Sequence, residues 1–221
     1  MTRAGRDEHL PPSERMVAFT DAAVAIALTL LVLPLVDIVP EAAHSGEPAS
    51  AVIRGNLPAI GSFLLSFAVI ARFWTVHHRL FGYDHRLTRT LVQLNLLWVL
   101  TIAILPFPTE MLASFSAARG FVVSFYLVVL LVCSASLTAM TTLMHRTAVI
   151  DDADEGVPES FVIGSLASTT TILVAFVVVL IAPQVGPWAF FILLADRIVE
   201  PVIRRLRGDR APRAEGRTGA T

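Results

Sequence analysis

The chain has 221 residues, of which 55% are hydrophobic and only 16% are charged, with a mean hydropathy of +0.69 and a net charge of −1. Soluble globular domains carry about 25% charged residues, so this composition excludes an ordinary soluble domain. The apolar residues are grouped in blocks of about 20, the length of helix that crosses a hydrocarbon core roughly 30 Å thick. The single cysteine, Cys133, excludes an internal disulfide and a thiolate zinc site. The composition therefore predicts a polytopic membrane protein.

Six apolar segments predict six transmembrane helices in an all-α fold. They cover residues 17–38, 52–76, 90–109, 121–144, 161–181 and 187–203. Strands of a barrel are excluded because the segments lack a period of two and are twice too long. The domain organisation that we expect is a cytoplasmic leader over residues 1–16, one transmembrane channel domain over residues 17–203, and an Arg-rich cytoplasmic tail over residues 204–221 that is disordered or lies along anionic headgroups.

The arginines orient the predicted helices, because the chain contains no lysine. Arginines that precede the first segment, or follow the second, fourth and sixth, share one side of the membrane: Arg3, Arg6, Arg15, Arg79, Arg86, Arg89, Arg146, Arg204, Arg205, Arg207, Arg210, Arg213 and Arg217. The opposite side has only Arg54 and Arg119. Positive residues are enriched on the cytoplasmic side. We therefore expect both termini in the cytoplasm and a multi-pass protein of the cell membrane.

The first apolar segment carries a carboxylate, Asp21, inside an apolar run that opens after Pro12 and Ser13. An ionisable residue at such a depth either belongs to a functional site or pairs with a basic residue to hold helices together, and both interpretations are open. Arg15 lies six residues earlier, which is about 240° around a helix at 100° per residue. The two side chains cannot share a face, so each is expected to contact neighbouring helices.

Helical spacing places four later residues of this segment on one stripe, namely Ile26, Thr29, Leu30 and Leu33. Asp37 extends the stripe if the helix continues through Pro34. The spacing alone fits a face against lipid or against other helices. If several copies met on an axis, the stripe would form apolar rings, a hydroxyl ring and an outer carboxylate ring. Such an arrangement is a cation pathway with a hydrophobic gate.

Two helix ends carry further polar or proline-rich features. Trp74, His77 and His78 flank one side of the second predicted helix near its cytoplasmic end, where they form an interfacial belt or an interhelical network. Pro106 and Pro108 are expected to unwind the last turn of the third predicted helix, since each removes a backbone donor.

Three segments between residues 13 and 110 share a pattern with a known family. The first is Arg15-x-x-x-Phe19-Thr20-Asp21, the second covers residues 73–81 with Phe-Trp and His-His-Arg, and the third covers residues 95–109 with Asn-Leu-Leu and Leu-Pro-Phe-Pro-Thr. They resemble the transmembrane protein 175 family of endolysosomal potassium channels, in particular its prokaryotic single-repeat members. The family signature is Arg-x-x-x-Phe-Ser-Asp, and here a threonine replaces the serine.

The resemblance implies a homotetramer of six-helix subunits whose first helices line a central pore that passes potassium in preference to sodium. No selectivity loop of the Thr-Val-Gly-Tyr-Gly kind is implied, and the sequence contains none. The family's constriction carries onto Ile26, Leu30 and Leu33, with a polar ring at Thr29. The predicted topology places Asp37 on the outer side, so we expect Asp37 at the outer mouth. An interhelical polar network is implied for the motif residues and their partners, namely Arg15, Phe19, Thr20, Asp21, His77, Asn95 and Trp98.

The sequence predicts no enzyme, because it lacks a Gly-x-Ser-x-Gly elbow, a His-Glu-x-x-His motif and a P-loop. No cofactor, nucleic acid or resident metal is expected beyond a permeating potassium ion, since His77 and His78 have no third ligand at helical spacing. The expected partners are further copies of the chain, the lipid bilayer and monovalent cations. Two alternatives to a channel stay open: a secondary transporter that uses Asp21 as a proton or cation site, and a structural membrane assembly protein.

Overall fold

The computed structural model describes residues 13–46, 48–83, 87–115, 119–151 and 156–183, which fold into helices without a strand. The helices are α1 (Ser13–Leu30), α2 (Leu33–Ser45), α3 (Ala49–Gly55), α4 (Leu57–Leu80), α5 (Arg89–Ile104), α6 (Pro106–Ser114), α7 (Arg119–Asp151) and α8 (Glu159–Ile181). Five stretches are long and apolar enough to cross a membrane: Ser13–His44, Leu57–Leu80, Arg89–Ser114, Gly120–Val149 and Glu159–Ile181. The predicted all-α multi-pass fold is confirmed. The predicted span 187–203 and the Arg-rich tail lie outside the described residues.

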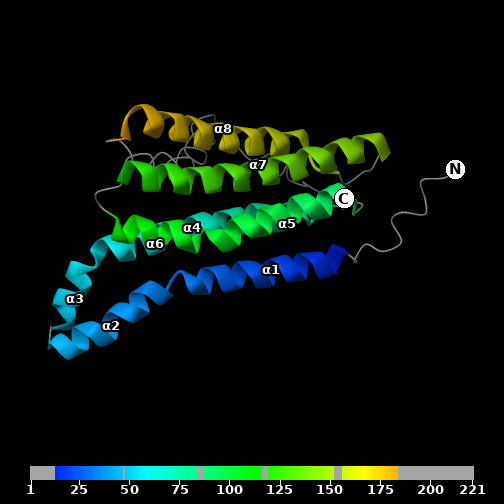
Figure 1. The fold of residues 1–221 in the computed structure, drawn as a ribbon. Helices are drawn as coiled ribbons and strands as arrows, with labels where there is room; N and C mark the ends of the chain where they lie inside the picture. Colours follow the sequence, from blue (N-terminus) through cyan, green and yellow to red (C-terminus); the bar gives the residue numbers. More distant parts are fainter. Residues whose placement is uncertain (1–12, 47, 84–86, 116–118, 152–155, 184–221) are drawn as a thin grey trace, which may run out of the picture.

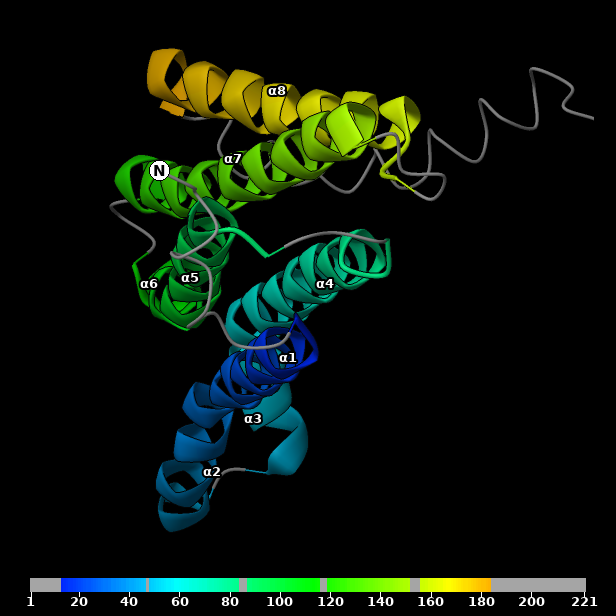
Figure 2. The ribbon, with the colours of Figure 1, turned by 90° about the vertical axis from the view of Figure 1, so that its right-hand side faces the viewer.

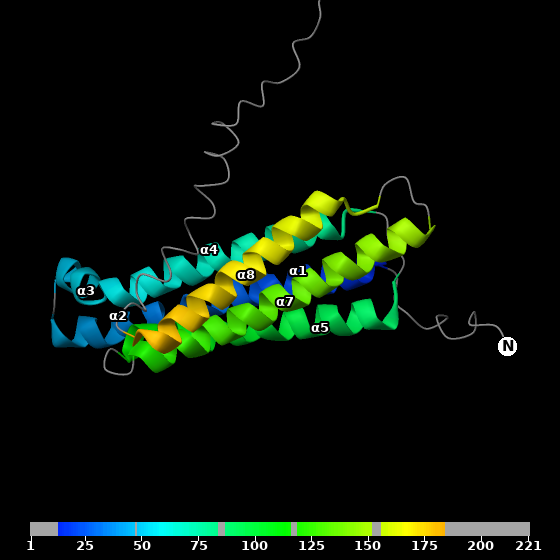
Figure 3. The ribbon, with the colours of Figure 1, turned by 90° about the horizontal axis from the view of Figure 1, so that it is seen from above.

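The long helices form a bundle of three layers (Figure 1). α7 and α8 pack on each other, α5 packs on α7, and α1 packs on α5 and α4. α1 therefore lies at the edge of the bundle, and the hairpin of α2 and α3 extends beyond it. The beginnings of α1 and α5 and the ends of α4 and α7 lie at one end of the bundle (Figures 1 and 3). Among the arginines that the sequence assigns to the cytoplasmic side, the four described ones lie near these helix ends: Arg15, Arg79, Arg89 and Arg146.

The first predicted span is interrupted at Leu31 and Val32, so its helix does not continue unbroken through Pro34, the condition on which the extension of the stripe to Asp37 rested. Pro34 has no N–H to donate to the carbonyl of Leu30, and its ring crowds that carbonyl. The N–H of Val32 instead donates to the oxygen of Thr29 at 3.4 Å. The helix restarts as α2, so much of the predicted outer connection is helical.

The third predicted helix keeps its last turns, which corrects the expectation that Pro106 and Pro108 unwind them. α5 ends at Ile104, and α6 begins at Pro106. A proline in the first turn of a helix removes an N–H that has no partner there in any case. The helix is therefore interrupted only at Leu105 and continues as α6, with the N–H of Thr109 donating to the oxygen of Leu105 at 3.1 Å.

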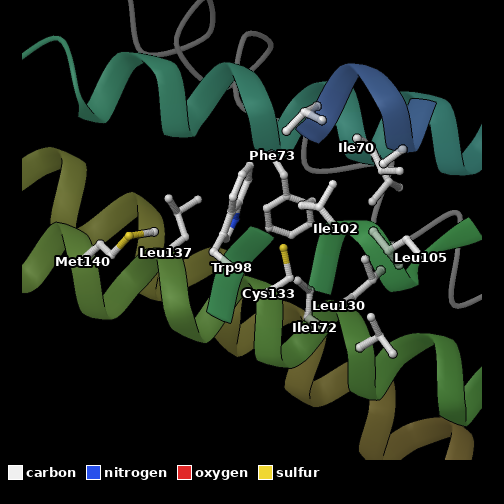
Figure 4. Packing of buried hydrophobic residues seen from close by; sticks show 14 of the residues in the cluster. Ile70, Phe73, Trp98, Ile102, Leu105, Leu130, Cys133, Leu137, Met140 and Ile172 are labelled. Carbon is white, nitrogen blue, oxygen red and sulfur yellow. The ribbon is translucent and has the colours of Figure 1, made fainter. Parts of the chain in front are cut away.

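The core lies around α5, between the layers that contain α4 and α7 (Figure 4). Trp98 and Ile102 of α5 are buried against Cys133 and Leu137 of α7. Ile172 brings α8 to the far side of this cluster. The apolar packing fixes α5 in the middle of the bundle, where its polar side chains can reach α1 and α4.

A buried hydroxyl cluster joins α4, α6 and α7. The hydroxyl of Thr109 lies 2.7 Å from that of Ser66 and 2.8 Å from the carbonyl oxygen of Leu105. The hydroxyl of Ser66 also lies 3.1 Å from that of Tyr126. Ser66 and Tyr126 are both 0% exposed. Because α6 follows the interruption at Leu105, this cluster fixes its direction against the bundle.

We expect Ser66→Ala to destabilise the purified protein by about 1 kcal/mol, since hydrogen bonds between membrane helices are worth roughly 0.6–2 kcal/mol. Thermal unfolding in detergent micelles measures the change. Ser62→Ala is the matched control, because the hydroxyl of Ser62 bonds only to the carbonyl of Pro58 in its own helix, at 2.9 Å. Equal stability of the two variants would contradict a tertiary role for the cluster.

Candidate functional site: a polar network and the exposed face of α1

Thr20 is the polar residue on the buried face of α1, where it meets α5. The face is formed by Met16, Thr20, Val24 and Ala27, and Thr20 is 0% exposed. Its hydroxyl donates to the carbonyl oxygen of Met16 at 2.9 Å. The oxygen of that hydroxyl accepts the Nδ2–H of Asn95 at 2.9 Å. Since the proton of Thr20 is already donated, the amide of Asn95 must turn its nitrogen toward α1.

The same orientation of Asn95 fixes the state of His77 on α4. The Oδ1 of Asn95 lies 2.7 Å from the Nε2 of His77, and an amide oxygen can only accept. His77 therefore carries its proton on Nε2. Asn95 and His77 are both 0% exposed, and this chain of hydrogen bonds links α1, α5 and α4.

Aromatic rings hold the imidazole of His77 in place. The ring stacks on Trp98 with a centroid distance of 4.3 Å and on Phe81 with a centroid distance of 4.5 Å. The Nδ1 of His77 and the Nε1 of Trp98 are buried without a hydrogen-bond partner among the described residues. Trp98 thus supports the network by stacking and not by a hydrogen bond.

Asp21 belongs to a second contact, on the surface of the bundle. Its Oδ1 accepts the Nε1–H of Trp74 on α4 at 2.7 Å. Its Oδ2 lies 3.8 Å from the Nδ1 of His78. The structure therefore places the candidates of the single predicted network at two sites: Thr20, Asn95, His77 and Trp98 inside the bundle, and Asp21 with Trp74 and His78 outside it.

Arg15 and Phe19 lie outside both contacts. Both side chains are exposed, Phe19 to 55%. Within the described part of the chain, no ion pair or hydrogen bond joins Arg15 to Asp21. Their separation around the helix, which the spacing predicts, is consistent with this placement.

The predicted stripe is the exposed face of α1. Ile26 is 61% exposed, Leu30 is 42% exposed, and Leu33, at the start of α2, is 50% exposed. Thr29 is also exposed, and its hydroxyl donates to the carbonyl oxygen of Ile26 at 2.7 Å. Asp37 is exposed on α2, beyond the break. The structure thus brings the stripe residues together at the edge of the bundle, opposite the buried polar network.

A hydroxyl ladder between α7 and α8 is a polar feature that the sequence reasoning missed. Thr138 lies 2.6 Å from the hydroxyl of Ser165 and 2.8 Å from that of Thr169, which in turn lies 2.7 Å from Ser134. Ser134 and Thr138, like Ser165 and Thr169, are four residues apart. That spacing in two apolar segments is the signal that could have indicated it.

The described residues contain no group of three histidine, cysteine, aspartate or glutamate side chains that could hold a metal ion. The polar side chains near the motif instead form hydrogen bonds between neighbouring helices. Their arrangement joins helices and offers no set of ligands that converges on one point.

The sequence is similar to known channels. The family model described as endosomal/lysosomal potassium channel TMEM175 matches residues 15–106. A potassium channel of Streptomyces collinus is 33% identical over 174 residues, which cover 75% of this chain and 83% of that channel. A potassium channel of Chamaesiphon minutus is 36% identical over 104 residues, which cover 46% of this chain and 49% of that channel. The endosomal/lysosomal proton channel TMEM175 of Mus musculus is 30% identical over 111 residues, which cover 49% of this chain and 21% of the mouse protein.

The fold is similar to a solved structure. The crystal structure of a lysosomal potassium-selective channel TMEM175 homolog from Chamaesiphon minutus matches with a TM-score of 0.65 and 24% identity. The match covers 90% of this chain and 98% of that chain. The two chains therefore share the fold.

We expect Asn95→Leu to destabilise the protein by about 1–3 kcal/mol, because it leaves the Nε2–H of His77 buried without an acceptor. Gln93→Leu is the matched control, since Gln93 is an exposed amide on the same helix. Thermal unfolding of both variants in detergent micelles measures the difference. An Asn95→Leu variant as stable as the Gln93→Leu variant would show that the network does not hold the helices together.

Proposed function

This chain belongs to the TMEM175 family of ion channels, and from that membership we propose that it is a potassium-selective channel that conducts passively. The family consists of channels and not of enzymes, and the chain is a multi-pass membrane protein that serves as a cation channel. The bacterial relatives from Streptomyces collinus and Chamaesiphon minutus are named potassium channels, and the mouse relative is named a proton channel. Potassium is proposed because the Streptomyces channel matches over most of its length.

The observation that carries the proposed mechanism is the exposed face of α1. The apolar residues Ile26, Leu30 and Leu33 lie on the side of α1 that contacts no other described helix. The polar side chains by which α1 contacts its neighbours lie on other sides of the helix, since Thr20 faces α5 and Asp21 faces α4. A homotetramer with four copies of α1 around a central axis uses this free face. The three aliphatic residues then form a hydrophobic constriction that gates by excluding water.

Thr29 supplies the polar ring of this pathway. Its hydroxyl proton is donated to the carbonyl oxygen of Ile26, so the lone pairs of the hydroxyl oxygen stay available. Four such oxygens around an axis can replace part of the hydration shell of a monovalent cation. No Thr-Val-Gly-Tyr-Gly filter is needed in this arrangement, and no cofactor takes part.

The two carboxylates have different roles in this proposal. Asp21 lies five residues before Ile26, about 140° around the helix, so it holds α1 to α4 and does not face the axis. Asp37 is exposed beyond the break in the helix. At the outer mouth of a tetramer, four such carboxylates raise the local concentration of cations. The arginine-rich end of the bundle is the cytoplasmic end, and the protein lies in the cell membrane.

We expect Ile26→Ala to raise passive potassium flux into liposomes several-fold, because a smaller side chain widens the constriction. Ile163→Ala is the matched control: Ile163 on α8 is 59% exposed, against 61% for Ile26, but lies on the other side of the bundle. A fluorescent potassium indicator inside the vesicles measures the flux.

Equal flux through the Ile26→Ala and Ile163→Ala variants would place the constriction elsewhere. Potassium movement that is coupled to a counter-ion in fixed ratio, and that Asp21→Asn abolishes, would contradict a channel and indicate a secondary transporter. No flux in either assay would leave a structural assembly role.

We expect Thr29→Val to reduce the permeability ratio of potassium over sodium, since it removes the hydroxyl ring and keeps the shape of the side chain. Reversal potentials in planar bilayers under bi-ionic conditions measure the ratio. Thr170→Val is the control, because Thr170 is also exposed and its hydroxyl donates to its own helix, to Leu166 at 2.9 Å. An unchanged ratio in the Thr29→Val variant would remove Thr29 from the pathway.

A further inference from the structure

A polar groove of about 460 Å³ lies between α4, α7 and α8. Figure 3 shows the beginning of α8 beside the end of α4, at the arginine-rich end. Ser134 and Leu137 of α7 line the floor of the groove, and Ser165 and Ser168 of α8 line one wall. The groove is separate from the motif contacts of α1, because none of its lining residues belongs to that helix.

The other wall of the groove is a basic face of α4. Arg72, Thr75 and Arg79 all line the groove, and their spacing of three and seven residues places them on one side of the helix. No aspartate or glutamate is among the described residues that line it. Two guanidinium groups therefore face one cavity together with serine and threonine hydroxyls.

This combination of groups is suited to a phosphate. Guanidinium groups form charge-assisted, often bidentate hydrogen bonds with phosphate oxygens, and hydroxyl groups add single donors. Arg72 lies seven residues before Arg79, about 10 Å deeper along α4 at 1.5 Å per residue.

The surface next to the groove is suited to acyl chains. Leu64 and Phe67 lie on the same side of α4 as the lining residue Ala71, closer to the middle of the helix, and they are 58% and 44% exposed. A lipid whose headgroup enters the groove can extend its chains along these residues. We propose that the groove binds the phosphate of an anionic phospholipid from the leaflet at the arginine-rich end of the bundle.

Native mass spectrometry of the full-length protein with dioleoyl-phosphatidylglycerol, and separately with dioleoyl-phosphatidylcholine, tests this binding. We expect phosphatidylglycerol to bind at least about tenfold more tightly than phosphatidylcholine. Arg72→Gln and Arg79→Gln are each expected to weaken phosphatidylglycerol binding about fivefold, the effect of one basic residue near an anionic membrane surface. Arg146→Gln is the matched control, because Arg146 is an exposed arginine near the end of α7 that does not line the groove.

A further variant, Ser160→Asp, tests the groove without changing an arginine. Its result therefore does not depend on whether the arginine substitutions destabilise the protein. Ser160 is exposed in the first turn of α8, where an aspartate is favourable for the helix, and it lines the groove. The added carboxylate repels a phosphate, so binding of phosphatidylglycerol is expected to weaken without a loss of thermal stability.

Three results would overturn the proposal. The first is that the Arg72→Gln, Arg79→Gln and Ser160→Asp variants bind phosphatidylglycerol as tightly as the Arg146→Gln control. The second is equal binding of phosphatidylglycerol and phosphatidylcholine to the unaltered protein. The third is displacement of phosphatidylglycerol by sodium phosphate at an equal concentration, which would indicate a site for free phosphate. None of these readouts depends on ion conduction.

Discussion

Polar groups inside a bilayer must find partners within the protein, and this constraint decides how α1 is held. Thr20 bonds to Asn95, and Asn95 bonds to His77, so three helices are joined by one buried chain of hydrogen bonds. Asp21 adds a contact with Trp74 at the surface. Every polar side chain of the motif that contacts the bundle lies on these two sides of α1. The third side is free of such contacts, and the proposed pore uses it.

The same constraint connects the motif with the proposed conduction. In a tetramer, the buried network fixes the rotation of α1 about its own axis, and that rotation decides which residues face the centre. In the proposed tetramer, the bond between Trp74 and Asp21 keeps this carboxylate off the central axis, and the exposed residues Ile26 and Thr29 face that axis. A signature that does not contact the ion can therefore be essential for the pathway. The groove between α4, α7 and α8 is lined by different residues, none of which belongs to α1.

The sequence predicted the five described helical spans, the separation of Arg15 from Asp21 and the stripe on one face of the first helix, because each follows from hydropathy or helical period. It did not predict that helices restart directly after the breaks at Leu31–Val32 and Leu105, since the nearby Pro34 and Pro106 mark a break but not how the next turn begins. Nor did the sequence predict that Thr20 would belong to a buried network and Asp21 to a separate contact on the surface. The partners of Asn95 depend on how α1, α4 and α5 pack. They lie 18 and 75 residues away along the chain, and local sequence patterns do not predict contacts over such separations.

The central claim is that the free face of α1 meets its copies on a shared axis, and cysteine cross-linking tests it most directly. Ile26→Cys in a chain that also carries Cys133→Ala gives one thiol on this face, and Ile163→Cys in the same background gives one on α8. Oxidation in native membranes is predicted to link subunits through position 26 and not through position 163, and a cationic thiol reagent is predicted to block flux only at position 26. Monomers alone at position 26, with undiminished flux after labelling, would contradict the account.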